Sequence, residues 1–96
     1  MNLHIDTSEM NTAKISVGRF KKSSQSRIVK SQMVLPLIEE LLRENNLTFT
    51  DITEITVTTG PGSFTGLRVG ATVANALGYL LDVPVNGKRA LVIPTY

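Results

Sequence analysis

The part of this sequence with residue types and spacing suited to chemistry is Gly60-Pro61-Gly62-Ser63-Phe64-Thr65-Gly66-Leu67-Arg68-Val69-Gly70. A β-branched run precedes this stretch, and a long apolar helix pattern follows it. Several glycines near a helix N-terminus are typical of an anion-binding turn, and the Ser63 hydroxyl is well placed to cap the helix. A P-loop, however, has four residues between its glycines and then Gly-Lys-Ser/Thr. Here five residues separate Gly60 from Gly66, so the stretch is not a P-loop.

Other candidate catalytic groups are few. In the nucleophile elbow the second glycine stands two residues after the serine, whereas Gly66 stands three residues after Ser63. His4 is the single histidine and the chain has no cysteine, which leaves no set of ligands for a transition metal. We interpret His4 as a solvated or hydrogen-bonded surface residue. We therefore predict no catalytic residue and no metal site in this chain.

The elements that must position the glycine-rich stretch follow from the hydrophobic periodicity. We expect strands at 2–7, 12–19 and 26–30, with a polar turn at 21–25 before the third, and then strands at 54–59 and 83–86. Helices are predicted at about 33–45 and 64–81. Proline is tolerated only near a helix start, so the first helix should begin close to Pro36. Asn86-Gly87 also suits a tight hairpin turn, which would make 88–93 a sixth strand.

These elements predict an α/β fold with a mixed five-stranded sheet of order 3-2-1-4-5 and two helices on one face, because crossovers are right-handed. The strand residues alternate in a way that supports one covered face and one solvated face. The residues predicted to lie beneath the helices are Leu3, Ile5, Ala13, Ile15, Val17, Ile55 and Val57. The residues predicted to face solvent are His4, Asp6, Lys14, Ser16, Arg27, Thr56 and Thr58.

Size and composition favour one small domain, residues 1–96, with little stability to spare. The chain has no run of eighteen apolar residues and no signal-peptide pattern at its N-terminus, and without cysteines it has no disulfides. A soluble cytoplasmic protein is the expectation.

The glycine-rich stretch resembles the signature of the bacterial TsaB (YeaZ) family. The flanks agree in order along the chain: Ile5-Asp6-Thr7-Ser8, Leu35-Pro36-Leu37-Ile38, Glu40-Leu41-Leu42, Asp51-Ile52 and Val83-Pro84-Val85-Asn86-Gly87. The resemblance implies the first of two actin-like (ASKHA, ribonuclease H-like) domains. In the family a third helix covers the second sheet face; the polar alternation here predicts a naturally shortened chain with that face open.

The resemblance also implies a function. The TsaB family is the non-catalytic partner in making threonylcarbamoyladenosine on tRNA, with TsaD as its partner; it also contacts an ATPase subunit, TsaE, through surfaces that include the absent second domain. Asp6, Thr7 and Ser8 stand where ATPases of this fold bind nucleotide. Because that site needs both domains, we interpret these residues as vestigial, with Asp6 and Thr7 bonding the local turn, and expect no cofactor.

Gly66, Gly70, Ala74 and Gly78 recur at every fourth residue and so line one helix face. Interior glycines cost about 1 kcal/mol each relative to alanine, which indicates close approach of another backbone. That backbone belongs either to this chain or to a second protein, and both contacts can coexist. The resemblance implies a four-helix interface with TsaD or with a second copy. We predict that the partner interface contains Met33, Leu37, Leu41, Gly66, Val69, Gly70, Val73 and Leu77.

A stretch free of acids between Glu9 and Glu39 carries six basic residues: Lys14, Arg19, Lys21, Lys22, Arg27 and Lys30. Such a cluster can attract the phosphates of tRNA, although lysines also protect an edge strand from unwanted pairing. Two functions are therefore carried forward. The first is a non-catalytic scaffold in tRNA modification; the alternative is a stand-alone actin-like domain that binds nucleotide or RNA.

Overall fold

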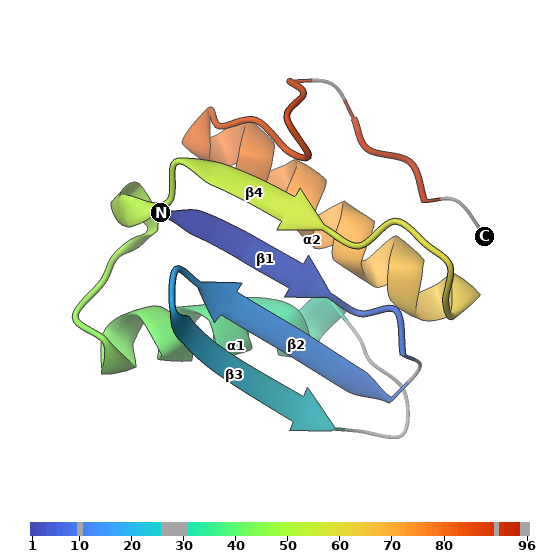
Figure 1. The fold of residues 1–96 in the computed structure, drawn as a ribbon, viewed down its shortest axis with the longest axis horizontal. Helices are drawn as coiled ribbons and strands as arrows, with labels where there is room; N and C mark the ends of the chain where they lie inside the picture. The colour runs from blue at the N-terminus through green and yellow to red at the C-terminus, as the bar shows by residue number, and fades with distance from the viewer. Residues whose placement is uncertain (10, 26–30, 90, 95–96) are drawn as a thin grey trace.

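A computed structural model of the chain describes residues 1–9, 11–25, 31–89 and 91–94. It has two layers, a four-stranded mixed sheet and a pair of helices (Figure 1). The elements are β1 (Asn2–Asp6), β2 (Thr12–Val17), β3 (Phe20–Gln25), α1 (Ser31–Glu44), the 3₁₀ turn η1 (Phe49–Asp51), β4 (Glu54–Val57) and α2 (Phe64–Leu81).

The sheet has the order β3-β2-β1-β4. β1 pairs antiparallel with β2 and parallel with β4, and β2 pairs antiparallel with β3. Both helices lie on the same face of the sheet, α1 across β2 and β3 and α2 beside β4 (Figure 1). The predicted order of the first four strands and the one-sided placement of the helices are therefore confirmed.

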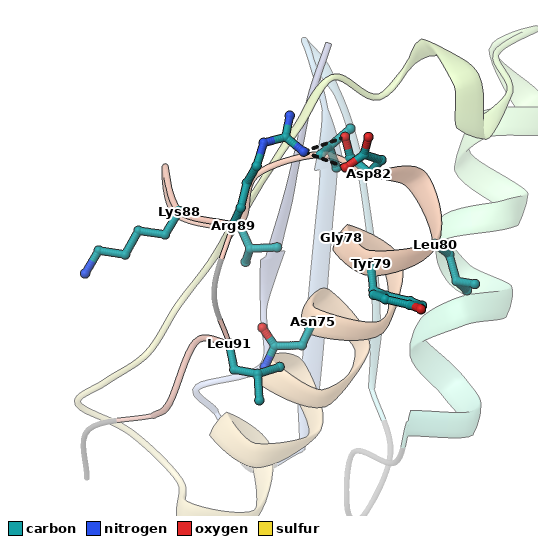
Figure 2. A pocket seen from close by; sticks show the side chains of 10 residues that line it. Asn75, Gly78, Tyr79, Leu80, Asp82, Lys88, Arg89 and Leu91 are labelled. Carbon is teal, nitrogen blue, oxygen red and sulfur yellow. Dashed lines mark hydrogen bonds and ion pairs between the residues drawn. The ribbon is translucent and has the colours of Figure 1, made fainter.

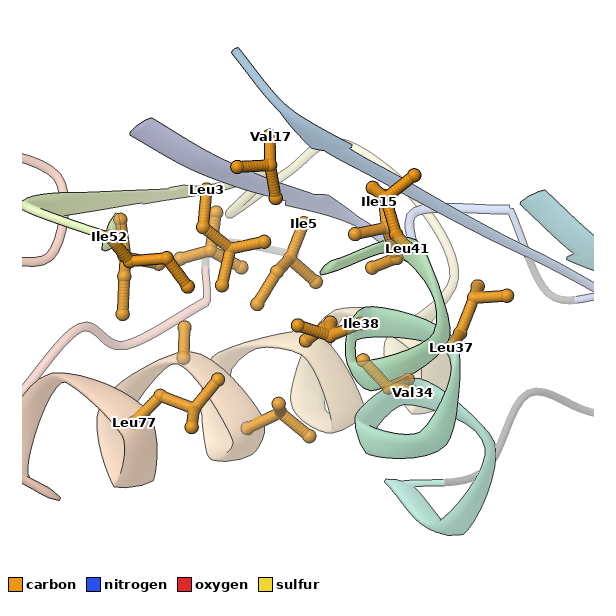
Figure 3. Packing of buried hydrophobic residues seen from close by; sticks show 14 of the residues in the cluster. Leu3, Ile5, Ile15, Val17, Val34, Leu37, Ile38, Leu41, Ile52 and Leu77 are labelled. Carbon is orange, nitrogen blue, oxygen red and sulfur yellow. The ribbon is translucent and has the colours of Figure 1, made fainter. Parts of the chain in front are cut away.

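The hydrophobic core fills the space between the sheet and the helices (Figure 3). Every strand residue that the alternation assigned to the helix side is buried. From α1 the core receives one apolar stripe, and its members are Val34, Leu37, Ile38, Leu41 and Leu42. The opposite side of the sheet carries polar side chains such as His4, Lys14 and Thr56. The sheet is therefore apolar on the covered face and polar on the open one, as its sequence predicts.

The third strand was placed wrongly. The structure has β3 at Phe20–Gln25, where we expected a polar turn, and β2 ends at Val17 rather than at residue 19. The turn between β2 and β3 is Gly18-Arg19, where Gly18 takes a positive φ of 58° and Val17 pairs with Phe20. β3 is an edge strand that is stabilised by backbone hydrogen bonds to β2. Its residues are mostly polar, so the sequence pattern did not indicate a strand there. The predicted strand at 26–30 lies outside the described residues.

The fifth strand was also predicted wrongly. Val85 forms only an isolated parallel bridge with Ile55, so the order 3-2-1-4-5 is reduced to four strands. Asn86 and Gly87 have φ values of 51° and 76°, and the amides and carbonyls of Val85 and Lys88 bond one another. These are the features of a tight hairpin turn of the primed type. The hairpin turn predicted at Asn86-Gly87 is therefore present, but residues 88–89 and 91–93 do not form the sixth strand that was predicted with it.

Helix α1 begins earlier than expected. It starts at Ser31, so Pro36 lies inside the helix rather than in its first turn. Pro36 is exposed and removes one backbone donor. Val34 and Leu37, on either side of Pro36, are buried in the core, and this packing offsets the lost hydrogen bond. Helix α2 agrees with its predicted bounds of 64–81.

Candidate functional site

The turn after β1 lies directly against the first turns of α2. The Thr7 side chain is fully buried, and its hydroxyl donates to the Gly66 carbonyl at 2.6 Å. The Ser63 amide donates to the Ser8 carbonyl at 2.7 Å. The Ser63 hydroxyl in turn accepts from the Gly66 amide at 3.2 Å, which confirms that Ser63 caps the helix. Strand β1 and the glycine-rich stretch therefore form one bonded unit.

Asp6 bonds within its own turn. Its Oδ1 accepts from the Ser8 amide at 3.0 Å and from the Ser8 hydroxyl at 2.6 Å. Partial burial alone would raise the pKa of the Asp6 carboxyl. The two bonds from Ser8, with the Lys14 and His4 side chains nearby, outweigh burial and lower this pKa below its ordinary value of 3.8. Asp6 is thus a stabilised carboxylate at neutral pH.

The glycines of the stretch allow this close approach. A Cβ on Gly62 would collide with the backbone of Ser8, and one on Gly66 or Gly70 would collide with Thr7. A Cβ on Gly78 would meet the Val85 side chain at 2.5 Å. The backbone that approaches the glycine face of α2 therefore belongs to this chain, and of the two interpretations of that face internal packing is confirmed.

This packing also limits the contacts that Asp6, Thr7 and Ser8 can make with a nucleotide. The hydroxyls of Thr7 and Ser8 and one oxygen of Asp6 are engaged in internal hydrogen bonds. Thr7 has no exposed surface at which a phosphate or a metal-bound water could bind it. Asp6 bonds its own turn, as predicted, whereas Thr7 bonds α2 rather than the local turn.

The predicted partner interface stays a prediction. Most of its members are buried within this single chain: Leu37, Leu41, Gly66, Gly70, Val73 and Leu77. Met33 and Val69 are half-buried and remain candidates. The reason is that the stripe that covers the sheet contains nearly all the large apolar residues of α1 and the small residues of α2.

The residues on the exposed side of the two helices differ from those predicted for the partner interface. On α2 it carries one charge, Arg68, among small and apolar side chains, and Tyr79 and Leu80 at its end are 87% and 74% exposed. On α1 it includes Leu35, which is 43% exposed. Sequence reasoning missed these residues, although a large apolar residue outside the core stripe was a signal for them. We call the exposed residues of α2 the outer face; its members are Phe64, Thr65, Arg68, Thr72, Ala76, Tyr79 and Leu80.

The basic cluster is partly neutralised. Lys14 pairs with Glu9 at 3.3 Å, and Lys22 reaches Glu44 of α1 at 3.0 Å. The bond to Glu44 raises the pKa of Lys22, and the Arg19 guanidinium lies over the Phe20 ring at 5.2 Å. Arg27 and Lys30 lie outside the described residues. Contact with tRNA through this cluster stays a prediction.

Besides a hollow of about 230 Å³ over Phe64, Arg68 and Thr72 on α2, two larger hollows mark the surface. One, of about 460 Å³, lies on the open sheet face and is lined by polar groups that include His4, Lys14 and Lys21. The other, of about 780 Å³, lies at the C-terminal end of α2 (Figure 2). It is bordered by Tyr79, Leu91 and the exposed ion pair between Arg89 and Asp82, which measures 2.6 Å. Among the described residues no group of three His, Cys, Asp or Glu side chains could hold a metal ion.

Comparison with known proteins agrees with this architecture. The profile of the family described as "TsaD: tRNA N6-adenosine threonylcarbamoyltransferase" matches residues 28–89. A structure titled YeaZ from Pseudomonas aeruginosa superposes with a TM-score of 0.70 at 29% identity over 88% of this chain and 41% of that one. A second structure, an uncharacterised protein similar to peptidase YeaZ from the same organism, gives 0.71 at 29% identity, with 88% and 40% coverage.

Two curated relatives carry the same name, tRNA threonylcarbamoyladenosine biosynthesis protein TsaB. The Haemophilus influenzae protein is 33% identical over 86 residues, which is 86% of this chain and 36% of the relative. The Bacillus subtilis protein is 36% identical over 61 residues, 64% of this chain and 27% of the relative. The chain thus spans about a third of the relatives' length at most.

The two-layer fold of sheet and helices, with its bonded glycine-rich turn, defines an α/β domain of the YeaZ type. The relatives found by sequence carry the TsaB name and agree with this structural similarity. The chain belongs to the TsaB (YeaZ) family, within the group that the TsaD profile describes. No helix in the described part of the chain is long and apolar enough to cross a membrane.

Proposed function

We propose that this chain is a non-catalytic subunit in the biosynthesis of threonylcarbamoyladenosine on tRNA, built on an actin-like domain. Its role is to bind a TsaD-type transferase through the exposed side of α1 and α2. The observation that carries this proposal is the outer face of α2, combined with relatives that are named for this pathway.

The composition of the outer face suits a helix-to-helix interface. Thr65, Thr72 and Ala76 are small, so another helix can approach closely, and Val69 beside them is half-buried. Arg68 is the one charged residue of the set. Interfaces are depleted of charge at their centres, and two such helices from each partner make a four-helix contact. The same interface accommodates either a TsaD-type partner or a second copy.

The internal hydrogen bonds of the turn after β1 support the proposal that the chain is non-catalytic. Thr7 and Ser8 use their hydroxyls to fasten β1 to α2 and to hold Asp6. A nucleotide would have to break these bonds to use the same groups. The turn therefore acts as a structural support that fixes α2, and with it the outer face.

The test is binding to a purified TsaD-type protein by calorimetry. Ala76→Glu and Thr72→Glu put a carboxylate at the centre of the outer face, where burial without a partner is costly. We expect each to weaken binding about 100-fold, as for a central contact residue. Ser23→Glu, on exposed β3, is the matched control and should bind like the wild type. Equal affinities for all four proteins would contradict the proposal.

The second candidate function is binding of RNA by the isolated domain. The hollow on the open sheet face favours it, because Lys14 and Lys21 lie there beside the His4 imidazole. The ion pair of Lys14 with Glu9 opposes it. Affinity for tRNA that falls steeply with salt and is lost in Lys21→Gln would support this function, whereas binding that ignores Lys21 would exclude this site.

A further inference from the structure

Arg68 is the one charged residue on the outer face of α2, and that face contains no acid to pair with it. Along a helix, ion pairs form between residues three or four positions apart. At these positions from Arg68 the side chains are all uncharged: Phe64, Thr65, Ala71 and Thr72. Arg43 and Arg89, by contrast, pair with carboxylates. Within the part of the chain that the structure describes, Arg68 forms no ion pair.

The Phe64 ring holds the Arg68 guanidinium in place. The Arg68 Cζ lies over this ring, 5.4 Å from its centroid, and the ring belongs to the residue one turn earlier on the same helix. The N–H donors of a guanidinium lie in its plane, so an aromatic ring over one face leaves them available. A group that is already oriented loses less conformational freedom when a partner binds it. The pair therefore presents oriented donors at the surface of α2.

The hollow of about 230 Å³ on α2 adjoins these donors. It is lined by Phe64, Thr65, Arg68, Val69 and Thr72. Sites for small molecules usually measure about 300–1,000 Å³, so this hollow suits a single side chain better than a free ligand. The two threonine hydroxyls can donate further hydrogen bonds to an acceptor there. The hollow thus combines one cation and two hydroxyls in a space for one side chain.

The charge of the outer face determines which kind of partner fits the hollow. A nucleic acid is bound by several cations together, about one for each phosphate that the protein neutralises. The outer face has only Arg68. A protein helix that packs on small side chains needs one acidic residue to match one cation. The match favours a carboxylate on a protein over the phosphates of a nucleic acid.

We propose that the hollow at Arg68 receives an Asp or Glu side chain from a helix of the TsaD-type partner. This inference rests on the proposed function, because it specifies one contact within that interface. The guanidinium donates a pair of parallel hydrogen bonds to the carboxylate, while Phe64 covers one of its faces. A helix with an apolar or basic residue at the same place would bury Arg68 without a partner, which is costly. The contact therefore selects among helices that could otherwise pack on the outer face.

The first test is binding to a purified TsaD-type protein by calorimetry at low and high salt. Arg68→Gln removes the charge and should weaken binding about tenfold or more. Binding by the wild type should weaken as salt is raised, and this dependence should be smaller in Arg68→Gln. Lys88→Gln is the matched control, since it removes one exposed positive charge outside the outer face and should bind like the wild type. Both variants should keep the melting temperature of the wild type, because neither side chain has an ion-pair partner among the described residues.

Phe64→Leu tests whether the ring positions the guanidinium. The change keeps an apolar side chain but removes the aromatic face, so binding to the TsaD-type protein should weaken a few-fold. In the Arg68→Gln background the same change should have little effect, because the ring acts through Arg68. Equal losses in both backgrounds would show that Phe64 does not act through Arg68 and would contradict the positioning role.

Arg68→Lys allows the acidic residue of the partner to be identified. A carbodiimide joins an amine to a carboxylate in contact with it but does not couple an arginine. In the complex of Arg68→Lys with the TsaD-type protein, mass spectrometry should find position 68 joined to one Asp or Glu of the partner. The wild type should show no cross-link at this position. A complex of Arg68→Lys that forms but is never joined through position 68 contradicts the proposal.

The outcomes separate this proposal from the proposed function. If Arg68→Gln binds the TsaD-type protein as tightly as the wild type, or no more weakly than Lys88→Gln, the carboxylate contact is overturned and the proposed function stands. If the wild type does not bind the TsaD-type protein at all, both fail. If Arg68→Gln loses affinity for tRNA and keeps its affinity for the TsaD-type protein, the hollow binds phosphate and the carboxylate contact is again overturned.

Discussion

Thr7 determines how the glycine-rich stretch is used. Its side chain is fully buried at the end of β1, and its hydroxyl has one partner, the Gly66 carbonyl in the first turn of α2. Gly66 and Gly70 leave room for this contact, since a Cβ at either position would overlap Thr7. The same glycines that suggested an anion-binding turn thus bring a strand and a helix within hydrogen-bond distance.

Gly70→Ala tests this contact. On an exposed helix the change would stabilise by about 1 kcal/mol, but here the new methyl group collides with the Thr7 hydroxyl. We expect a net loss of about 1–3 kcal/mol in the free energy of unfolding, measured with urea. Thr72→Ala, at an exposed position of the same helix, should change stability by less than about 0.5 kcal/mol. A Gly70→Ala protein as stable as the wild type would show that the turn after β1 can move away without loss.

Asp6 predicts a pH dependence. Its pKa is lower in the folded chain than its ordinary value. It therefore stabilises the fold at pH values above the unfolded-state pKa, and this contribution is lost as the pH falls through the folded-state pKa. The melting temperature of Asp6→Asn should lie below that of the wild type at neutral pH, and the gap should narrow in acid. In Ser8→Ala, the Asp6 pKa measured by NMR should move up toward its ordinary value. A gap that does not change with pH would contradict this role.

At the scale of elements, an asparagine side chain replaces part of a missing strand. The Asn86 Oδ1 accepts from the Val57 amide at 2.8 Å, and its amide donates to the Val57 carbonyl at 3.1 Å. The backbone N–H of Asn86 also donates to the Ile55 carbonyl. Together these bonds supply partners to backbone groups on the outer edge of β4, where a fifth strand was expected. Asn75 does the same for Val92. Two side chains therefore do what a strand ladder would do.

Asn86→Ala should be much more harmful than an ordinary turn substitution. It removes two hydrogen bonds from a partly buried strand edge and places alanine at a positive φ of 51°. We expect a loss of about 2–3 kcal/mol and faster hydrogen exchange at the Val57 amide. Asn46→Ala is the control, since Asn46 has a φ of 56° but no side-chain hydrogen bond. If both variants lose the same stability, the cost comes from the backbone alone and the clamp on β4 contributes nothing.

The elements also show where sequence-based prediction succeeds. The core strands and α2 were predictable because their periodicity reflects burial, which is strong for Leu3, Ile5 and Ile55. β3 was missed because backbone pairing with β2 defines it, and its polar residues carry little burial signal. The fifth strand was overpredicted because Val85 is buried like a strand residue but its neighbour Asn86 bonds β4 through its side chain.

For the candidate site, the bond between the Ser63 hydroxyl and the Gly66 amide was predictable from helix-capping rules. The contact between Thr7 and Gly66 was not, because it joins residues far apart in the sequence.

At the scale of the whole molecule, one face of the sheet is open and polar in the described structure. Its outward residues include His4, Lys14 and Ser16, and the apolar residues of the sheet all point to the helices. A face of this kind needs no second layer of helices to exclude water. The N-terminal ammonium also bonds the Asp51 carbonyl at 2.7 Å, which fastens β1 to the segment before β4. Because one covered face is enough, the 96-residue chain should fold by itself, although it matches only 27–36% of the length of its curated relatives.

We therefore predict a single cooperative unfolding transition for the isolated 96-residue chain. Its stability should be roughly 5 kcal/mol or slightly more, with a urea dependence of about 1 kcal/mol per molar, as for other small domains. Curves from circular dichroism and from tyrosine fluorescence should coincide. Tyr79 lies at the end of α2 and reports on that helix, so hydrogen exchange in β1 is the measurement that reports on the sheet. Hydrogen exchange should be slowest at the buried residues of β1 and faster at residues 91–94, where Asn75 is the only hydrogen-bonded attachment in the described structure. Helix loss ahead of sheet loss would mean that the contact of Thr7 with α2 is too weak to couple the two layers, and that the outer face is positioned only once a partner has bound.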